Sequence, residues 1–371
     1  MASTNDLLLH EAISHQVDMA HYSNGEIYRM IALLNKVDSD LFAQLTIALE
    51  QMPEGSFSTD RLESLLISVR SLNKRAYDEM EIQLTADMRA LTAYEAGYQY
   101  QLFASVIPQG VVAQVGIATV NVQQVYAAAM ARPFQGRLLK EWAQSLEAGR
   151  MLRIRDSIRM GYVEGQTISE IIKRIRGTRA KGYTDGIIEI DRRNAESVVR
   201  TAISHTAAYA RDQFNKANGD LVKSVQWAST LDGRTTEICM LRDGKQYTND
   251  THKPIGHSLP WLGGPGKAHW NCRSMDVPIL KSFKDLGINI DDLTPKARAS
   301  MDGQVPADMT YADWLSKQNA ARQDEILGPT RGKLLRDGGL TLDRFANNKG
   351  KWYTLDELQK KDAAAFAKAG I

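Results

Sequence analysis

Two cysteines and one histidine are the residues whose types and spacing are best suited to chemistry. Cys239 is followed further along the chain by His269-x-x-Cys272. Cysteine sulfur and imidazole nitrogen are soft ligands, and His-x-x-Cys is a spacing that can hold zinc. A structural zinc site needs a fourth ligand, and the nearest candidates are His252, His257 and Asp232. Because no fourth ligand is clear, we expect no bound metal and no other cofactor. If zinc does bind, its candidate ligands are Cys239, His269 and Cys272.

The same residues suggest two kinds of enzyme. Cys239 or Cys272 could act as a nucleophile with His269 as its base, but the sequence indicates no oxyanion hole and no orienting acid. A His/Cys metal-dependent nuclease would need a second metal-binding pair and acidic residues beside the histidine. The glycines at 263–266 lack the Lys-Ser/Thr of a phosphate loop and indicate a turn. We expect that the protein is not an enzyme and keep the nuclease as an alternative.

The segment that carries these residues has the character of a small β domain. Val225-Gln226-Trp227 is strand-like, and Gly, Pro, Asp and Asn dominate from there to Pro265. We therefore predict a compact, turn-rich, β-containing core near 222–280.

Helices are expected on both sides of this core. Within 1–131 we predict three helices, capped by Asn5 or Asp6, by Asn24, and by Asp38 or Ser39. A long stripe of apolar residues at helical spacing follows over 62–91. Residues 96–131 contain no charged residue, and a break at Pro108 and Gly110 precedes a helix over 122–131. Short helices are predicted over 311–318, 320–327 and 354–360 in the C-terminal part.

Residues 132–220 are also expected to be helical. A capping box at Thr167 and Glu170 begins one helix, and another long helix covers 192–218. Basic residues are concentrated here, and they are candidates for contact with DNA or with an acidic protein surface, a solvated helix face being the alternative. These candidates are Arg150, Arg153, Arg155, Arg159, Lys173, Arg174, Arg176, Arg179 and Lys181.

Charge is distributed unevenly along the 371 residues. The chain has 46 basic and 44 acidic residues, a net charge of +2, yet residues 1–131 hold 7 basic and 15 acidic ones and residues 132–200 hold 15 and 9. This partition indicates at least two differently charged faces. We expect three regions: an acidic helical region over 1–131, a central domain over 132–280 and a helical tail over 281–371. A fragment covering 132–371 should then fold without the first region.

These observations bound the class of protein. Two cysteines exclude a disulfide scaffold. The N-terminus has no signal-peptide pattern, and we expect no transmembrane helix and no membrane partner. The predicted fold is α+β and mostly α-helical: an N-terminal arm or bundle, a helical lead-in, the small core and a tail of short helices.

The ordered set of motifs resembles a known family. Arg200-Thr201, Trp227, Asp232-x-Arg234-Thr235, Cys239, Asp243-Gly244 and His269-x-x-Cys272-Arg273 are similar to the phage Mu protein F-like, or phage head morphogenesis, family of minor capsid proteins. Many members have two further cysteines, at the positions of Thr236 and Ser274, and their loss weakens the case for a metal. The resemblance covers 132–360 and is firmest over 195–280 and 310–335.

This resemblance implies a structural role in assembly. Such proteins are present in few copies in the phage head, associate with the portal and the major capsid or scaffold protein during procapsid assembly, and in some cases affect DNA delivery. It implies a location in the virion, in the head interior or at the portal vertex, after assembly in the host cytoplasm. A DNA-binding internal head protein is the alternative. We expect Arg200, Trp227, Asp232 and His269 to stabilise the core.

Overall fold

The computed structural model describes residues 4–52, 58–283, 286, 298–306 and 308–371. Contacts group the chain into two compact units, each built from separate stretches of sequence. The sheet unit comprises 1–20, 92–125 and 207–371, and the helical unit comprises 21–91 and 126–206. These units group the chain differently from the three expected regions, whose boundaries at 131 and 280 stay a prediction.

The N-terminal part is one continuous helix, α1 (Thr4–Glu50), where we predicted three. Gly25 lies inside it, although glycine costs about 1 kcal/mol in a helix interior. The expected caps have other partners: Asn24 accepts a hydrogen bond from Arg200, and the Asp38 carboxylate pairs with Arg150 and Arg192. The helix continues through both positions, so the breaks predicted at Asn24 and Asp38 are wrong. Both side chains bind arginines and do not cap a helix.

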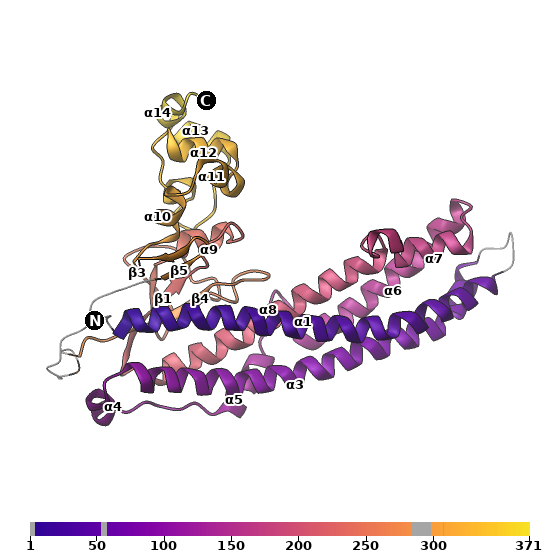
Figure 1. Cartoon of the computed structure of the whole chain (residues 1–371), viewed down its shortest axis with the longest axis horizontal. Helices are drawn as coiled ribbons and strands as arrows, with labels where there is room; N and C mark the ends of the chain where they lie inside the picture. Colours follow the sequence, from indigo (N-terminus) through magenta and orange to yellow (C-terminus); the bar gives the residue numbers. More distant parts are fainter. Residues whose placement is uncertain (1–3, 53–57, 284–285, 287–297, 307) are drawn as a thin grey trace. The chain divides into compact units, whose positions relative to one another are not determined.

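The helical unit packs long helices around one apolar core. Its elements include α2 (Thr59–Leu65), most of α3 (Ile67–Val106), α6 (Leu139–Val163), α7 (Ile168–Arg176) and the start of α8 (Ile187–Ala217). Figure 1 shows these helices running alongside one another. The predicted apolar stripe is buried for most of its length, with Leu65 and Leu72 partly exposed. The expected capping box is confirmed, since Thr167 accepts from the Glu170 backbone and the Glu170 carboxylate accepts from the Thr167 backbone.

The sheet unit contains the predicted β-containing core. β1 (Val222–Ala228) lies between β2 (Gln246–Thr248) and β4 (Met275–Leu280), and β3 (Pro254–Ile255) pairs with β2, so that the order β3-β2-β1-β4 is antiparallel throughout. One short helix, α9 (Glu237–Arg242), interrupts the turn-rich segment and was not predicted. A separate hairpin joins β5 (Arg298–Ser300) and β6 (Gly303–Val305).

Helices from distant parts of the sequence complete the core of the sheet unit. Phe103 of α3 meets Phe214 of α8 edge to face, and Leu8 of α1 belongs to the same buried cluster as Trp227 and Tyr247. The uncharged segment also contributes, because Ile107 and Val111 are buried there on either side of the Pro108 break. This break separates α3 from α4 (Gln109–Val115), and α5 (Val122–Met130) follows as predicted.

Short helices form the C-terminal part of the sheet unit. They are α10 (Tyr311–Ser316), α11 (Ala320–Leu327), α12 (Pro329–Arg336), α13 (Leu355–Lys361) and α14 (Ala363–Ala369), with a short 3-10 helix, η2, at Leu342–Phe345. Their own cluster of buried residues includes Tyr311, Trp314 and Phe345. The structure confirms a mostly helical α+β fold. In the described part of the chain, no helix combines the length and the apolar character needed to cross a membrane.

Candidate functional site

The cysteines and the histidine singled out in the sequence lie together in the sheet unit. Cys239 is the third residue of α9, whereas His269 and Cys272 lie in the loop before β4. The two sulfur atoms are 3.8 Å apart, and the Cys239 sulfur is 3.1 Å from His269 Nε2. Both cysteines are buried free thiols, and the histidine is partly exposed. The fold thus gathers two sulfur atoms and one imidazole nitrogen at a single point, with all three within 4.8 Å of one another.

Neighbouring groups fix the direction of these side chains. His269 Nδ1 is 2.9 Å from the Trp270 carbonyl oxygen, which can only accept, so Nδ1 carries the proton and the neutral ring keeps a lone pair on Nε2. The Gly266 backbone N–H donates to the Cys272 sulfur at 3.2 Å. Thr236, an exposed residue at the start of α9, places its hydroxyl oxygen 2.9 Å from His269 Nε2.

The cluster favours one thiolate. The hydrogen bond between the two cysteines lowers the pKa of Cys272 well below its usual value and raises the pKa of Cys239. Burial of the His269 ring opposes its protonation, but the contact with Cys272 outweighs burial and raises the pKa of His269. A thiolate beside an imidazole can bind a soft cation or act as a nucleophile.

The three residues considered as a fourth ligand have other partners. His252 lies 3.0 Å from the Asp212 carboxylate, and His257 Nε2 lies 2.9 Å from the Gln246 carbonyl oxygen. Asp232 accepts two hydrogen bonds from the Arg273 guanidinium, at 2.6 and 2.8 Å. Within the described residues, the only cluster of His, Cys, Asp and Glu with ligand atoms this close is Cys239, His269 and Cys272.

The Asp232–Arg273 pair ties the turn after β1 to the loop before β4. Burial raises the pKa of the Asp232 carboxyl, but the Arg273 guanidinium outweighs this and lowers it overall. The Asp232 carboxylate also accepts from the backbone N–H of Arg234, whose side chain is exposed. This bidentate pair positions Cys272, because Arg273 is the next residue.

Other motif residues hold the turn between β1 and β2. Trp227 is fully buried and meets Trp261 edge to face. Asp243 accepts hydrogen bonds from the backbone N–H groups of Ser229 and Tyr311, at 2.6 and 2.7 Å. Gly244 has φ +76°, a left-handed conformation that favours glycine, and its N–H donates to the Trp227 carbonyl oxygen. These residues therefore have structural roles around the Cys–His cluster.

Arg200, the remaining motif residue, belongs to the helical unit. It lies on α8 and donates to Asn24 at 3.0 Å and to Glu196 at 2.8 Å. Both contacts lie within the helical unit and stabilise α8 there, so the expected role of Arg200 in the β-containing core stays a prediction.

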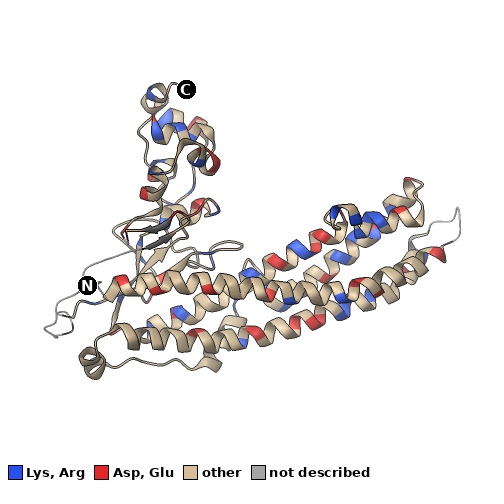
Figure 2. Ribbon diagram, viewed as in Figure 1, with Lys and Arg blue, Asp and Glu red and all other residues tan. Residues whose placement is uncertain are grey.

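The basic candidates of the helical unit fall into two groups. Arg150 is 1% exposed and pairs with Asp38, and Arg153 pairs with the buried Asp191. Arg155, Arg159 and Arg174 also form ion pairs with carboxylates. The exposed residues are Lys173, Arg176, Arg179 and Lys181, on α7 and on the 3-10 helix η1 (Arg179–Lys181) that follows it. Figure 2 shows basic positions gathered along this stretch.

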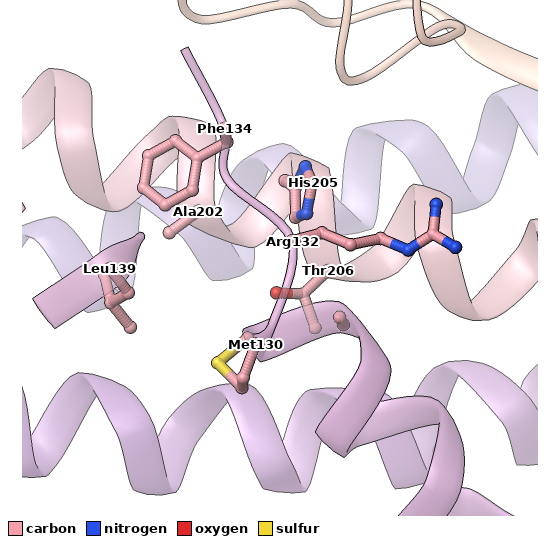
Figure 3. A pocket seen from close by; sticks show the side chains of 8 residues that line it. Met130, Arg132, Phe134, Leu139, Ala202, His205 and Thr206 are labelled. Carbon is pink, nitrogen blue, oxygen red and sulfur yellow. The ribbon is translucent and has the colours of Figure 1, made fainter. Parts of the chain in front are cut away.

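Two hollows lie among the described residues of the helical unit. The first lies where Ala202, His205 and Thr206 of α8 face Phe134 and Leu139 (Figure 3), and its cavity is only about 10 Å³. This is the lower limit for one water molecule. The second, of about 420 Å³, has one ionisable side chain in its lining, Asp40. Two titratable side chains, Arg132 and His205, line the first hollow, but its volume leaves no room for a ligand larger than water.

Comparison with known proteins identifies part of the chain. Residues 152–276 match the model of the family described as Phage Mu protein F like protein. The chain contains a phage Mu protein F-like region. This match supports the interpretation of the chain as a phage head morphogenesis protein. The family consists of structural proteins of the phage head. No curated protein and no solved structure matches the chain.

The Mu F-like region contains every residue of the motif, from Arg200 to Arg273, and includes both cysteines. Of the two segments where the resemblance was firmest, it covers 195–276 and leaves out 277–280, which includes Pro278, and 310–335. The resemblance of 310–335, and that of the lead-in before residue 152, stay predictions.

The Mu F-like region also contains two buried charged residues, Arg211 and Asp276, that the sequence patterns did not indicate. Arg211 of α8 is buried and donates to Asp276 of β4 at 2.9 Å and to Glu95 of α3 at 3.0 Å. Glu95 in turn lies 2.6 Å from Nε2 of His15 on α1. One signal could have indicated them: a charged residue inside an otherwise apolar helical face or strand needs a partner of opposite charge.

Proposed function

We propose that this protein is a minor capsid protein of a tailed bacteriophage, which binds the portal and the inner capsid or scaffold protein during procapsid assembly. The observation that carries the proposal is the match of residues 152–276 to the Mu F-like family. The protein would remain in the virion, in the head interior or at the portal vertex. In this role it would assist DNA packaging or ejection by its position and not by catalysis.

The exposed basic residues at the end of α7 supply a contact surface for this role. Lys173, Arg176 and Arg179 are exposed, and Arg176 also stacks over Phe42 and Tyr183, which holds the guanidinium in place. Arg150 is left out of the surface because it is buried and paired. Such a surface suits an acidic protein, and it equally suits DNA phosphates. The second candidate function is therefore a DNA-binding internal head protein.

The first experiment asks whether the protein is part of the head. Procapsids and mature virions of the phage that encodes this chain are purified and analysed by mass spectrometry, and the full chain is mixed with purified portal rings. We expect the protein in procapsids and a complex with portal rings that survives high salt. Absence from both particles would overturn the proposal.

The second experiment separates the protein partner from DNA. A charge-reversal variant carries Lys173→Glu, Arg176→Glu and Arg179→Glu, and the matched control carries Lys317→Glu, Lys349→Glu and Lys360→Glu, three exposed lysines of the sheet unit. If DNA is the partner, affinity falls with salt. The plot of log affinity against log salt should then be less steep for the variant than for the control, its slope smaller in magnitude by about 3. If the portal is the partner, only portal binding changes.

A further inference from the structure

We propose that Cys239, Cys272 and His269 bind one zinc ion, with a water molecule in the fourth position. The sequence analysis expected no metal because no fourth protein ligand was clear. The geometry of the three side chains supports a different conclusion, and it does so independently of the proposed role in the phage head.

The spacing of the ligand atoms fits a tetrahedral ion. With Zn–S bonds of about 2.3 Å and tetrahedral angles, two sulfur ligands lie about 3.8 Å apart. The two sulfur atoms here are 3.8 Å apart. A sulfur and a histidine nitrogen on the same ion would lie about 3.5 Å apart, and the distance from Cys239 Sγ to His269 Nε2 is 3.1 Å. All three ligand atoms lie within 4.8 Å of one another, so the ion would draw together side chains that are already gathered.

The surroundings of the ligands are those of a metal site. Metal-binding histidines donate their other ring N–H to a carbonyl or carboxylate, which fixes the tautomer. His269 Nδ1 does this with the Trp270 carbonyl oxygen at 2.9 Å, and Nε2 faces the sulfur atoms. Ligating sulfur atoms are commonly hydrogen-bonded in turn, and the Gly266 N–H donates to Cys272 Sγ at 3.2 Å.

We place the water on the side of the cluster that carries exposed side chains. Cys239 and Cys272 are buried, but His269 is partly exposed and Thr236 beside it is exposed. The Thr236 hydroxyl lies 2.9 Å from His269 Nε2, where it can hold a metal-bound water by a hydrogen bond. Two thiolates and one imidazole with a water favour zinc over magnesium or calcium, which prefer oxygen ligands.

A disulfide explains the cluster less well. A disulfide would require the sulfur atoms to approach from 3.8 Å to about 2.0 Å. It would also leave the contact between Cys239 and His269 without a role. Zinc uses all three side chains, whereas a disulfide uses only two.

The test measures zinc in the full chain. The protein is purified with a thiol reductant, loaded with excess Zn²⁺, desalted and analysed for metal by mass spectrometry. The variants are Cys239→Ser, Cys272→Ser and His269→Gln, and the control is His257→Gln, another partly exposed histidine of the sheet unit. We expect about one zinc per chain in the natural protein and the control, and loss of zinc in the two cysteine variants. The absence of stoichiometric zinc in the natural protein, or equal zinc in all variants, would overturn the proposal.

A second measurement needs no variant, so it holds even if the variants do not fold. The reduced natural protein is titrated with Co²⁺ and followed by absorption spectroscopy. A thiolate-to-cobalt charge-transfer band, together with the intense visible bands of tetrahedral cobalt, is the expected result. Weak octahedral bands alone, or free thiols that react with Ellman's reagent equally fast with and without Zn²⁺, would contradict the site.

Discussion

The two units of this protein each bury a small ionic network, and the networks have opposite composition. In the sheet unit one cation, Arg211, lies between two carboxylates, Glu95 and Asp276. In the helical unit one carboxylate, Asp38, lies between two cations, Arg150 and Arg192. Each central residue is at least nine-tenths buried.

The two networks account for part of the uneven charge along the sequence. Asp38 and Glu95 belong to the acidic first 131 residues, whereas their arginine partners lie on α6 and α8. Part of the charge partition is thus neutralised inside the units, and only the remainder can form charged faces. Removing the central residue of either network also leaves two like charges close together, which is costly where they are buried.

The largest effect is expected when the N-terminal helices are removed. The sequence suggested that 132–371 folds alone, but in the sheet unit Leu8, Phe103, Ile107 and Val111 pack in the same core as Trp227. We therefore expect the 132–371 fragment to show no cooperative unfolding transition by tryptophan fluorescence, which reports mainly the sheet unit because five of the six tryptophans lie there.

A point variant tests the same packing in the full chain. Phe103→Ala should lower the free energy of unfolding by about 3–5 kcal/mol, because its ring packs edge to face on Phe214. Tyr100→Ala on the same helix is the control, since Tyr100 is exposed. A fragment that unfolds cooperatively, with Phe103→Ala near neutral, would support the predicted domain boundary at residue 131.

The next effect comes from the centre of the sheet-unit network. Arg211→Met leaves Glu95 and Asp276 buried without their cation, so we expect a loss of about 3–5 kcal/mol in urea unfolding followed by tryptophan fluorescence. Adding Glu95→Gln and Asp276→Asn should recover part of this loss, because the uncompensated charges are then gone. Arg193→Met, at an exposed position of α8, serves as the control. No recovery in the triple variant would show that packing, and not charge, sets the cost.

A smaller effect is expected at the centre of the helical-unit network. Asp38→Asn leaves Arg150 buried, but Arg192 keeps a contact with Glu189 at 3.6 Å, so one of the two cations remains paired. We expect a loss of about 2–3 kcal/mol, followed by far-ultraviolet circular dichroism. Asp40→Asn, exposed and two residues away, is the control. Equal losses for Asp38→Asn and Arg211→Met would contradict the proposed difference between the networks.

The smallest effect concerns pH and a third ion pair, between Asp212 and His252 in the sheet unit. Burial raises the pKa of Asp212, but the hydrogen bond to His252 and the charges of Lys267 and Lys216 lower it overall, from 3.8 to about 2. Its folded pKa is depressed, so its stabilisation is present above about pH 4 and is lost as pH falls toward 2. The difference in pKa corresponds to about 2 kcal/mol.

Acid titration of stability measures this contribution. We expect the natural protein to lose stability between about pH 4 and 2 more steeply than Asp212→Asn, which lacks the titrating carboxyl. Parallel curves for the two proteins would show that Asp212 does not contribute.

Local patterns predicted much of the fold, and tertiary contacts changed the rest. The stripe over 62–91, the capping box at Thr167 and the short C-terminal helices were predictable because each depends on neighbouring residues. The breaks in α1 were predicted wrongly, since Asn24 and Asp38 have the right type for caps but bind distant arginines. The helix α9 was missed because six residues between turns carry little periodic signal.

The sequence by itself determined the class of the protein and its chemical inventory. The ordered motifs indicated a Mu F-like protein, and Cys239, His269 and Cys272 were identified as the soft ligands. The tertiary structure decided which residues meet, because spatial proximity between distant segments follows from packing and leaves no trace in local spacing. It placed the two cysteine sulfur atoms 3.8 Å apart, paired the Asp232 carboxylate with the Arg273 guanidinium, and buried Arg150 against Asp38.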